Sequence, residues 1–176
     1  MKIYLWAFII SLAIIQVIVF GKEMNSNTCC KIGAEGQAKY DEKVQQLMQQ
    51  CIQELDLANQ TEDKQREGFV CVVECVGRKV NVIDANKNLI EKGLRNFVIN
   101  EMALEPYQKV VAEQTIKKCT EELKTPSPET NGCSHIVLRA SSCVEAELFK
   151  SCPADKQDTS DECVKLRQEI NSGKDS

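Results

Sequence analysis

The ten cysteines are the residues of this chain whose type and spacing most clearly predict chemistry. Their number is even, and they follow a long apolar N-terminal segment. In a chain that enters an oxidising compartment, such a set predicts a framework of disulfides. A structural zinc site is the competing interpretation, but the chain has one histidine and no Cys-x-x-Cys pair. We therefore predict five disulfides, with no metal and no cofactor. The cysteines are Cys29, Cys30, Cys51, Cys71, Cys75, Cys119, Cys133, Cys143, Cys152 and Cys163.

Geometry restricts how these cysteines pair. Cys71 and Cys75 are four residues apart, and on one helix face their Cβ atoms would lie about 5–6 Å apart. A disulfide needs Cβ atoms about 3.5–4.5 Å apart, so these two cysteines are expected to take different partners. Cys29 and Cys30 are adjacent, and a bond between neighbours strains the peptide. They too are expected to reach two different partners.

The N-terminal segment predicts the compartment. Lys2 is followed by a nearly continuous apolar run and then by Gly21, a pattern typical of a secretory signal peptide. An uncleaved membrane anchor is the alternative, because the run approaches a membrane-spanning length. We expect a signal peptide over residues 1–21. We expect a secreted, extracellular chain over residues 22–176, which suits a single domain.

Charge and composition limit the partners of the mature chain. Without residues 1–21 the chain has 21 basic residues against 26 acidic ones, a net charge of −5. This mild acidity argues against nucleic acid and anionic membranes as partners. Aromatic residues make up 5% of the sequence, which argues against a surface for stacking bases.

Apolar residues recur at intervals of three and four, which predicts an all-α fold. The valines between Phe69 and Val80 would also allow a strand, but the charged residues among them favour a helix. Two prolines and a glycine predict a loop over residues 124–132. The expected helices are residues 38–57, a helix that starts after Thr61, residues 86–103, a helix opened by Pro106, a helix from Cys133 or Ser134 to Lys150, and a short last helix behind a capping box at 159–162.

Two polar positions have alternative interpretations. The sequon Asn59-Gln60-Thr61 could carry a glycan on a loop, or Thr61 could cap the following helix. His135, the one histidine, could act as a pH switch for ligand release, or it could lie on the surface beside a disulfide.

Six of the cysteines resemble the six-cysteine signature of insect odorant-binding proteins, the pheromone and general odorant-binding family. Three residues separate the second from the third, and eight separate the fifth from the sixth. The six are Cys51, Cys71, Cys75, Cys119, Cys143 and Cys152.

The remaining cysteines resemble those of the Plus-C subgroup of this family. Cys133 and Cys163 are added cysteines, and Pro153 directly follows Cys152. The resemblance covers nearly the whole mature chain. The interval between Cys119 and Cys133 is short for the subgroup.

The resemblance implies a compact, disulfide-linked bundle of about six to eight helices around an internal hydrophobic pocket. It also implies interlocked pairing. The implied disulfides are Cys51–Cys75, Cys71–Cys143 and Cys119–Cys152. We predict that Cys29 and Cys30 pair with Cys133 and Cys163, which ties an N-terminal arm to a C-terminal extension. A Cys133–Cys163 bond is the alternative, although it leaves the adjacent pair strained.

The function implied by the resemblance is that of a carrier. Such a protein binds small hydrophobic molecules, odorants or pheromone-like ligands, and transports them through aqueous lymph to chemoreceptors. An odorant receptor and a second copy of the chain are further partners that the resemblance suggests. The Tyr107 hydroxyl could bind a ligand carbonyl or alcohol. For each lining residue, the alternative role is ordinary core. The expected lining residues are Val73, Val76, Leu94, Phe97, Val98, Tyr107, Val111, Val137, Ala140, Val144 and Leu148.

Rival functional classes are less favoured. Secreted helical phospholipases need a histidine beside a cysteine pair, but Lys31-Ile32-Gly33 follows Cys29-Cys30 here. No Gly-x-Ser-x-Gly motif is present either. We therefore expect no catalytic residues and no enzymatic activity. Two non-olfactory alternatives stay open: a secreted protein that sequesters ligands in saliva, glands or reproductive fluid, and a structural protein with a filled core.

Overall fold

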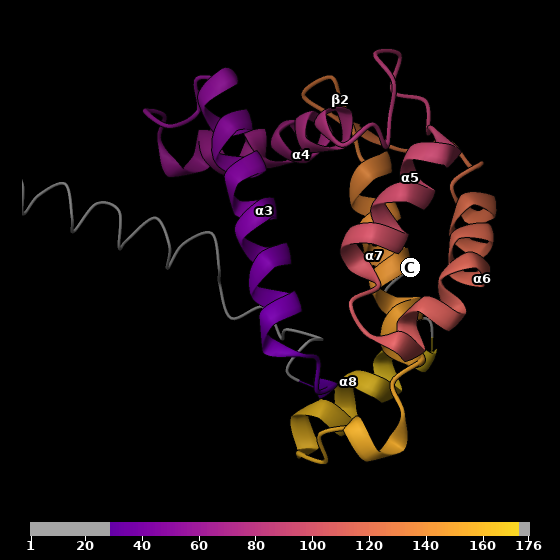
Figure 1. Ribbon diagram of the computed structural model, residues 1–176. Coiled ribbons are helices and arrows are strands. Elements are labelled where there is room, and N and C mark those ends of the chain that lie inside the picture. Colours follow the sequence, from indigo (N-terminus) through magenta and orange to yellow (C-terminus); the bar gives the residue numbers. More distant parts are fainter. Residues whose placement is uncertain (1–28, 173–176) are drawn as a thin grey trace, which may run out of the picture.

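The computed structural model describes residues 29–172. The expected signal peptide, residues 1–21, and the last four residues lie outside this range. Within it the chain forms six α-helices, a π-helical turn, a 3-10 turn and one small hairpin (Figure 1). This confirms the all-α fold class. No helix among the described residues combines the length and the apolar character that a membrane span requires.

The first two helices, α3 (Ala34–Glu54) and α4 (Glu62–Lys79), pack against each other. α3 begins four residues earlier than expected, because Gly33 adopts the extended conformation of an N-cap. α4 begins directly after Thr61, as predicted, and carries acidic residues in its first turn and basic residues in its last. These charges complement the helix dipole, so the valine-rich segment is a helix and not a strand.

The next helix is shorter than the sequence pattern suggests. We expected a helix over residues 86–103, but α5 (Glu91–Phe97) starts later and continues as the π-helical turn η1 (Val98–Met102). One Asp84 carboxylate oxygen accepts the backbone N–H groups of Asn86 and Asn88, each at 2.8 Å. This local turn satisfies backbone donors that a helix would otherwise use, so the helix cannot start before it.

The central pair of helices is α6 (Pro106–Glu122) and α7 (Ile136–Lys150), which lie side by side. Pro106 occupies the first turn of α6, as predicted. Most of the expected loop between them is irregular, but β1 (Glu129–Thr130) at its end pairs with β2 (Cys133–Ser134). The predicted helix start at Cys133 or Ser134 is therefore wrong, because these two residues form β2 and α7 begins at Ile136. The two turn residues between β1 and β2 both have positive φ, 52° and 75°, which an Asn-Gly pair adopts readily.

The C-terminal segment consists of the 3-10 turn η2 (Ala154–Lys156) and α8 (Asp161–Ser172). The Ser160 carbonyl accepts the Val164 N–H at 2.9 Å, so α8 starts at Asp161, one residue later than a helix capped by Thr159 would. The Lys31 N–H donates to the Lys156 carbonyl at 2.9 Å. The N-terminal segment therefore lies against the connection that precedes α8.

All ten cysteines form disulfides, and two of the expected connections are present. Cys51–Cys75 is confirmed, and Cys29 pairs with Cys163, within the predicted set of partners. The remaining bonds join Cys30 to Cys152, Cys71 to Cys133 and Cys119 to Cys143. The geometric rule holds, because Cys71 and Cys75 take different partners.

Three of the expected connections are wrong: Cys71–Cys143, Cys119–Cys152 and the bond between Cys133 and the N-terminal pair. The hairpin returns across α4, which brings Cys133 next to Cys71 and occupies that sulfur. The side-by-side packing of α6 and α7 then brings Cys143 to Cys119. Cys152, just beyond α7, lies in the segment that meets the N-terminal arm, where Cys30 is available.

Candidate ligand-binding core

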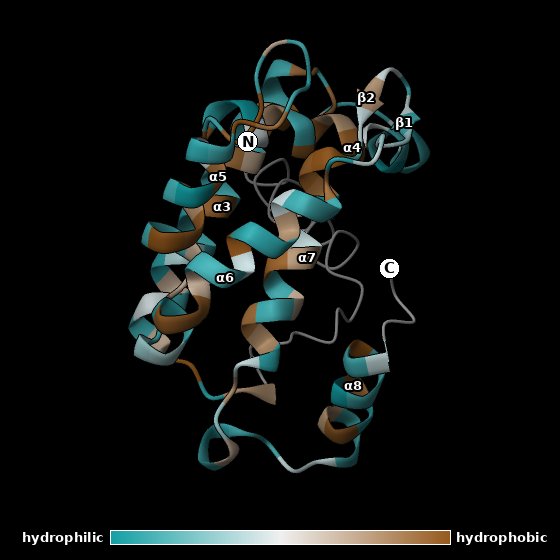
Figure 2. Cartoon of the chain, turned by 90° about the vertical axis from the view of Figure 1, so that its right-hand side faces the viewer, coloured by the Kyte–Doolittle hydropathy of each residue, from teal (hydrophilic) through white to brown (hydrophobic). Residues whose placement is uncertain are grey.

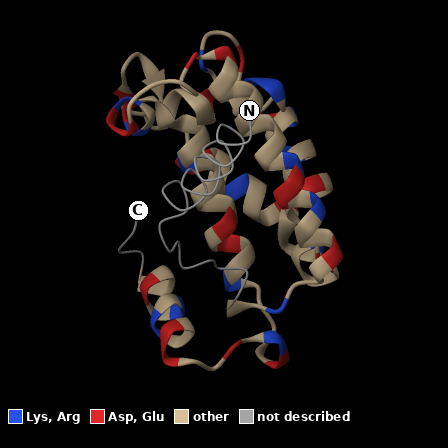
Figure 3. Cartoon of the chain, turned by 90° about the vertical axis from the view of Figure 1, so that its left-hand side faces the viewer, with Lys and Arg blue, Asp and Glu red and all other residues tan. Residues whose placement is uncertain are grey.

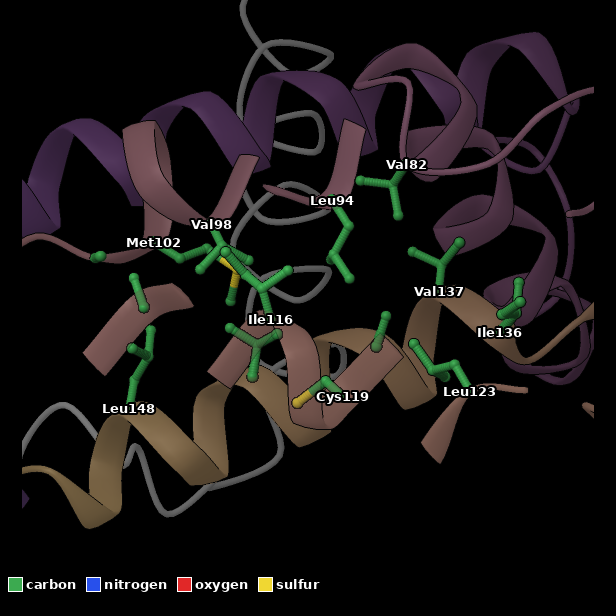
Figure 4. Packing of buried hydrophobic residues seen from close by; sticks show 14 of the residues in the cluster. Val82, Leu94, Val98, Met102, Ile116, Cys119, Leu123, Ile136, Val137 and Leu148 are labelled. Atoms are coloured by element: carbon green, nitrogen blue, oxygen red, sulfur yellow. The ribbon is translucent and has the colours of Figure 1, made fainter. Parts of the chain in front are cut away.

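The largest apolar cluster lies between α5, η1, α6 and α7. Hydrophobic residues alternate with hydrophilic ones along these helices, as expected when one side of each is buried (Figure 2). Figure 4 shows the buried side chains converging from the four elements. We call these residues the main cluster: Val82, Ile83, Leu94, Val98, Met102, Ala103, Ala112, Ile116, Cys119, Leu123, Ile136, Val137, Ala140, Val144 and Leu148.

The structure brings together most of the residues expected to line a pocket. Six are buried members of the main cluster: Leu94, Val98, Val137, Ala140, Val144 and Leu148. Three are half-buried and pack against its margin: Val73, Phe97 and Val111. Among the described residues, Val76 is half-buried on α4 and belongs to no core cluster.

The margin of the main cluster is completed by α3. Tyr40 packs against the cluster, and its ring centroid lies 6.5 Å from that of Phe97 at an interplanar angle of 50°. Lys43, one turn further along the same side of α3, forms an ion pair with Glu101 in η1. α3 is therefore held here to the end of α5 by a ring pair and to η1 by an ion pair.

The rest of the apolar face of α3 is only partly covered. Val44, Leu47 and Met48 follow Tyr40 at helical spacing and are half-buried, and Cys51 is the one residue of α3 that is fully buried. A helix that packs fully into a core buries a continuous apolar stripe. Beyond Tyr40, which packs against the main cluster, the apolar face of α3 therefore stays only partly covered.

Tyr40 adds one polar group to this apolar margin. Burial raises the pKa of the Tyr40 hydroxyl above its ordinary value of 10.0, and the negative charges of Glu145, Asp41 and Glu101 raise it further. The phenol stays neutral at any physiological pH, so its chemistry is that of an uncharged hydrogen-bonding group among apolar neighbours.

Tyr107 lies elsewhere than expected. It packs with a second cluster, formed by Cys29, Cys30, Phe149, Cys152 and Cys163. Its hydroxyl is 3.0 Å from the Cys30 sulfur, and the Lys156 ammonium lies 5.4 Å from its ring centroid. The Tyr107 hydroxyl is thus engaged where the two terminal segments meet, and the structure does not place it among the main-cluster residues.

Comparison with known proteins decides the family. The model of the PBP/GOBP family matches residues 33–147, more than half of the chain. The chain belongs to the PBP/GOBP family. Searches of curated proteins and of solved structures gave no match. The matched range contains α3 to α6 and most of α7, and with them every residue of the main cluster except Leu148.

Membership of the PBP/GOBP family sets the kind of function. Its members are binding proteins that carry odorants and pheromones, and they are not a family of enzymes. The ten cysteines, all in disulfides, support the Plus-C subgroup. Five disulfides also agree with an extracellular location, because such bonds persist in oxidising compartments.

Sequence reasoning missed several residues of the candidate site in this PBP/GOBP protein. Tyr40 was not singled out, although it lies four residues before Val44 on the predicted apolar face. Met102 and Ile116 carried the right spacing and were assigned to helices, but not to the site. Val82 and Ile83 lie in a turn, where no helical periodicity points to burial.

His135 lies at the end of the hairpin and not in the main cluster. Its Nε2 atom is 2.8 Å from the Thr130 hydroxyl, and its backbone N–H donates to the Pro128 carbonyl at 3.0 Å. Cys133, two residues earlier, is bonded to Cys71. This position corresponds to the second of the two alternatives, a histidine beside a disulfide.

Proposed function

We propose that this chain is a secreted carrier that binds small hydrophobic molecules at the main cluster and transports them through aqueous lymph to chemoreceptors. The observation that carries the proposal is the partly covered apolar face of α3, which meets the main cluster at Tyr40, in a chain of the PBP/GOBP family. Covering apolar surface is worth roughly 25 cal/mol per Å², so a small apolar ligand gains affinity by filling this position.

The pocket in this proposal is lined by those residues named from the sequence that belong to the main cluster or pack against its margin, with two changes that the packing supports. Tyr40 is added as the aromatic and polar group of the α3 side. Tyr107 is given a structural role at the junction of the terminal segments. The preferred ligands are then apolar molecules with at most one hydrogen-bonding group.

The test is displacement of a fluorescent apolar probe from the oxidised protein by a panel of alcohols, esters, indoles and fatty acids. We expect saturable one-site binding with selective displacement. Phe97→Ala removes a half-buried ring from the margin and should weaken probe binding by about tenfold, the equivalent of about 1.4 kcal/mol.

The matched control is Val110→Ala, a truncation on α6 at a side chain that is 83% exposed. This variant should bind the probe like the wild type. A correctly oxidised wild type that takes up no probe would contradict the proposal. Detection of the protein in antennal lymph, as opposed to saliva or reproductive fluid, separates the olfactory role from the non-olfactory alternative.

A further inference from the structure

The loop between α3 and α4 holds the one Asn-x-Ser/Thr sequon of the chain, Asn59-Gln60-Thr61. Such a sequon is an acceptor for an N-linked glycan in a chain that passes through the secretory pathway. The sequence left a second role for Thr61, that of a side-chain cap for the following helix. The two roles compete for the same hydroxyl, and the structure separates them.

Thr61 occupies the N-cap position of α4, but its side chain makes no capping hydrogen bond. The Thr61 carbonyl accepts the Gln65 N–H at 2.9 Å, so the helix starts here without help from the Thr61 side chain. Glu62 and Asp63 supply the negative charge that favours a helix N-terminus. The exposed Thr61 hydroxyl is therefore not needed by the helix.

Asn59 is exposed, and no hydrogen bond among the described residues uses its side chain. Its neighbours hold the loop: the Gln60 side chain donates to the Asp56 carbonyl at 3.2 Å, and the Gln65 side chain donates to the Leu57 carbonyl at 3.2 Å. The loop keeps its shape without Asn59, so the folded protein can accommodate a large substituent on this side chain.

The loop is also distant from the second cluster. It lies at the end of the molecule opposite α8 in Figure 1. Leu57 anchors it to α4, because a Cβ atom on Gly68 would lie 2.6 Å from the Leu57 Cδ1 atom. A glycan on Asn59 would project from this end, away from the junction of the terminal segments.

We propose that Asn59 carries an N-linked glycan in the secreted protein. The co-substrate is a lipid pyrophosphate-linked oligosaccharide. The Asn59 side-chain nitrogen forms a bond to the anomeric carbon of the first sugar and loses one proton, while the bond from that carbon to the pyrophosphate oxygen breaks and the lipid pyrophosphate leaves. No oxidation or reduction takes place. The Thr61 hydroxyl is the group that the transferase recognises in the sequon.

The test is translation of the full chain with microsomes, followed by protease protection and by digestion with a peptide N-glycosidase. The wild type and Thr61→Ser, which keeps the hydroxyl, should give a protected species with the mass of one added glycan. Asn59→Gln and Thr61→Ala should give a protected species without it. Because Thr61 makes no side-chain cap, Thr61→Ala should unfold at the same temperature as the unglycosylated Thr61→Ser.

Three results would overturn the proposal. The first is a wild-type chain that is protected, and therefore translocated, but has its unmodified mass. The second is a glycan that persists in Asn59→Gln. The third is a chain that is not protected at all, because the Asn59 amide then never reaches the transferase. Asn59→Gln should bind the apolar probe like the wild type, so a loss of ligand binding is a separate result.

Discussion

Glu105 is the residue that joins three separate segments of the chain. One of its carboxylate oxygens accepts the Gly33 N–H at 2.7 Å, and the other accepts the Lys156 ammonium at 2.6 Å. Glu105 itself directly precedes α6, and its backbone N–H donates to the Gln108 side chain at 2.9 Å. A single carboxylate thus connects the start of α3, the start of α6 and the segment before α8.

The charge of Glu105 should make stability depend on pH. The hydrogen bond from Lys156, and then that from Gly33, hold the pKa of the Glu105 carboxyl below its ordinary value of 4.5. A group whose pKa is lower in the folded state stabilises the fold above its unfolded pKa and loses that contribution as the pH falls through the folded pKa. Glu105→Gln should therefore lower the free energy of unfolding at pH 7 by about 1–2 kcal/mol.

Denaturant unfolding with the disulfides intact checks this prediction at pH 7 and at pH 3. The difference between wild type and Glu105→Gln should shrink between pH 7 and pH 3, because protonation of the Glu105 carboxylate as the pH falls makes the wild type more like the variant. The control is Glu35→Gln, because Glu35 pairs with Lys39 on the exposed side of α3 and should contribute less than about 1 kcal/mol. An equal difference at both pH values would contradict the role of the charge.

Glu74 is a second carboxylate whose environment predicts a large effect. It is 3% exposed, pairs with Arg78 and accepts the Ser134 N–H at 2.5 Å. Glu74→Ala leaves a buried N–H without a partner and should cost about 2–3 kcal/mol of unfolding free energy. Glu54→Ala breaks a more exposed pair with Lys79 and should cost under about 1 kcal/mol. Equal losses in urea unfolding would show that burial of Glu74 is not the cause.

At the scale of elements, the approach of α5 to the turn after α4 depends on Gly93. A Cβ atom built on Gly93 would lie 1.7 Å from the Asn81 carbonyl oxygen, which is backbone and cannot rotate away. The packing of this short helix on the turn is thus possible only with glycine at this position.

Two alanine substitutions test this contact. Gly93→Ala forces the backbone apart and should destabilise the protein by about 2 kcal/mol or more in thermal or urea unfolding. Gly36→Ala lies within α3, where the nearest atom is the Leu104 Cβ at 3.7 Å, and should stabilise the protein by up to about 1 kcal/mol. A tolerated Gly93→Ala would mean that α5 does not approach Asn81 this closely.

Helix starts were predictable where one local signal dominated. Thr61 with its acidic neighbours and Pro106 each marked the start of a helix correctly. The start of α5 could not be predicted in this way. The apolar periodicity of residues 86–103 continues through a turn whose shape is fixed by hydrogen bonds to the Asp84 side chain. The spacing of apolar residues indicates which side of a helix is buried. It gives no information on a carboxylate such as that of Asp84, which accepts backbone N–H groups that a helix would otherwise use.

At the scale of the whole molecule, two disulfides tie the N-terminal arm to the C-terminal extension. Cys29–Cys163 and Cys30–Cys152 span 134 and 122 residues, whereas Cys51–Cys75 and Cys119–Cys143 each span 24. Acidic and basic residues are interspersed along the helices that Figure 3 shows.

Peptide mapping under non-reducing conditions tests this connectivity. Cleavage after Glu74 separates Cys71 from Cys75, and cleavage after Arg139 separates Cys133 from Cys143. We expect crosslinked peptides that join Cys71 to Cys133 and Cys119 to Cys143. Partial reduction and alkylation then assign the adjacent Cys29 and Cys30. A peptide that joins Cys71 to Cys143 would contradict the structure and restore the interlocked pairing.

The sequence by itself determined the all-α class, the family and six of the fifteen residues of the main cluster. These follow from local information: helical spacing places Leu94, Val98 and Val144 on buried sides, and the cysteine spacing identifies the family. Only the tertiary structure decided the partners of Cys71 and the position of Tyr107. Both depend on which segments meet after the chain folds, and the hairpin and the terminal arm make those contacts across more than 60 residues of sequence. The spacing of residues along the chain does not determine these long-range contacts, because each cysteine has several possible partners that satisfy the same local geometry.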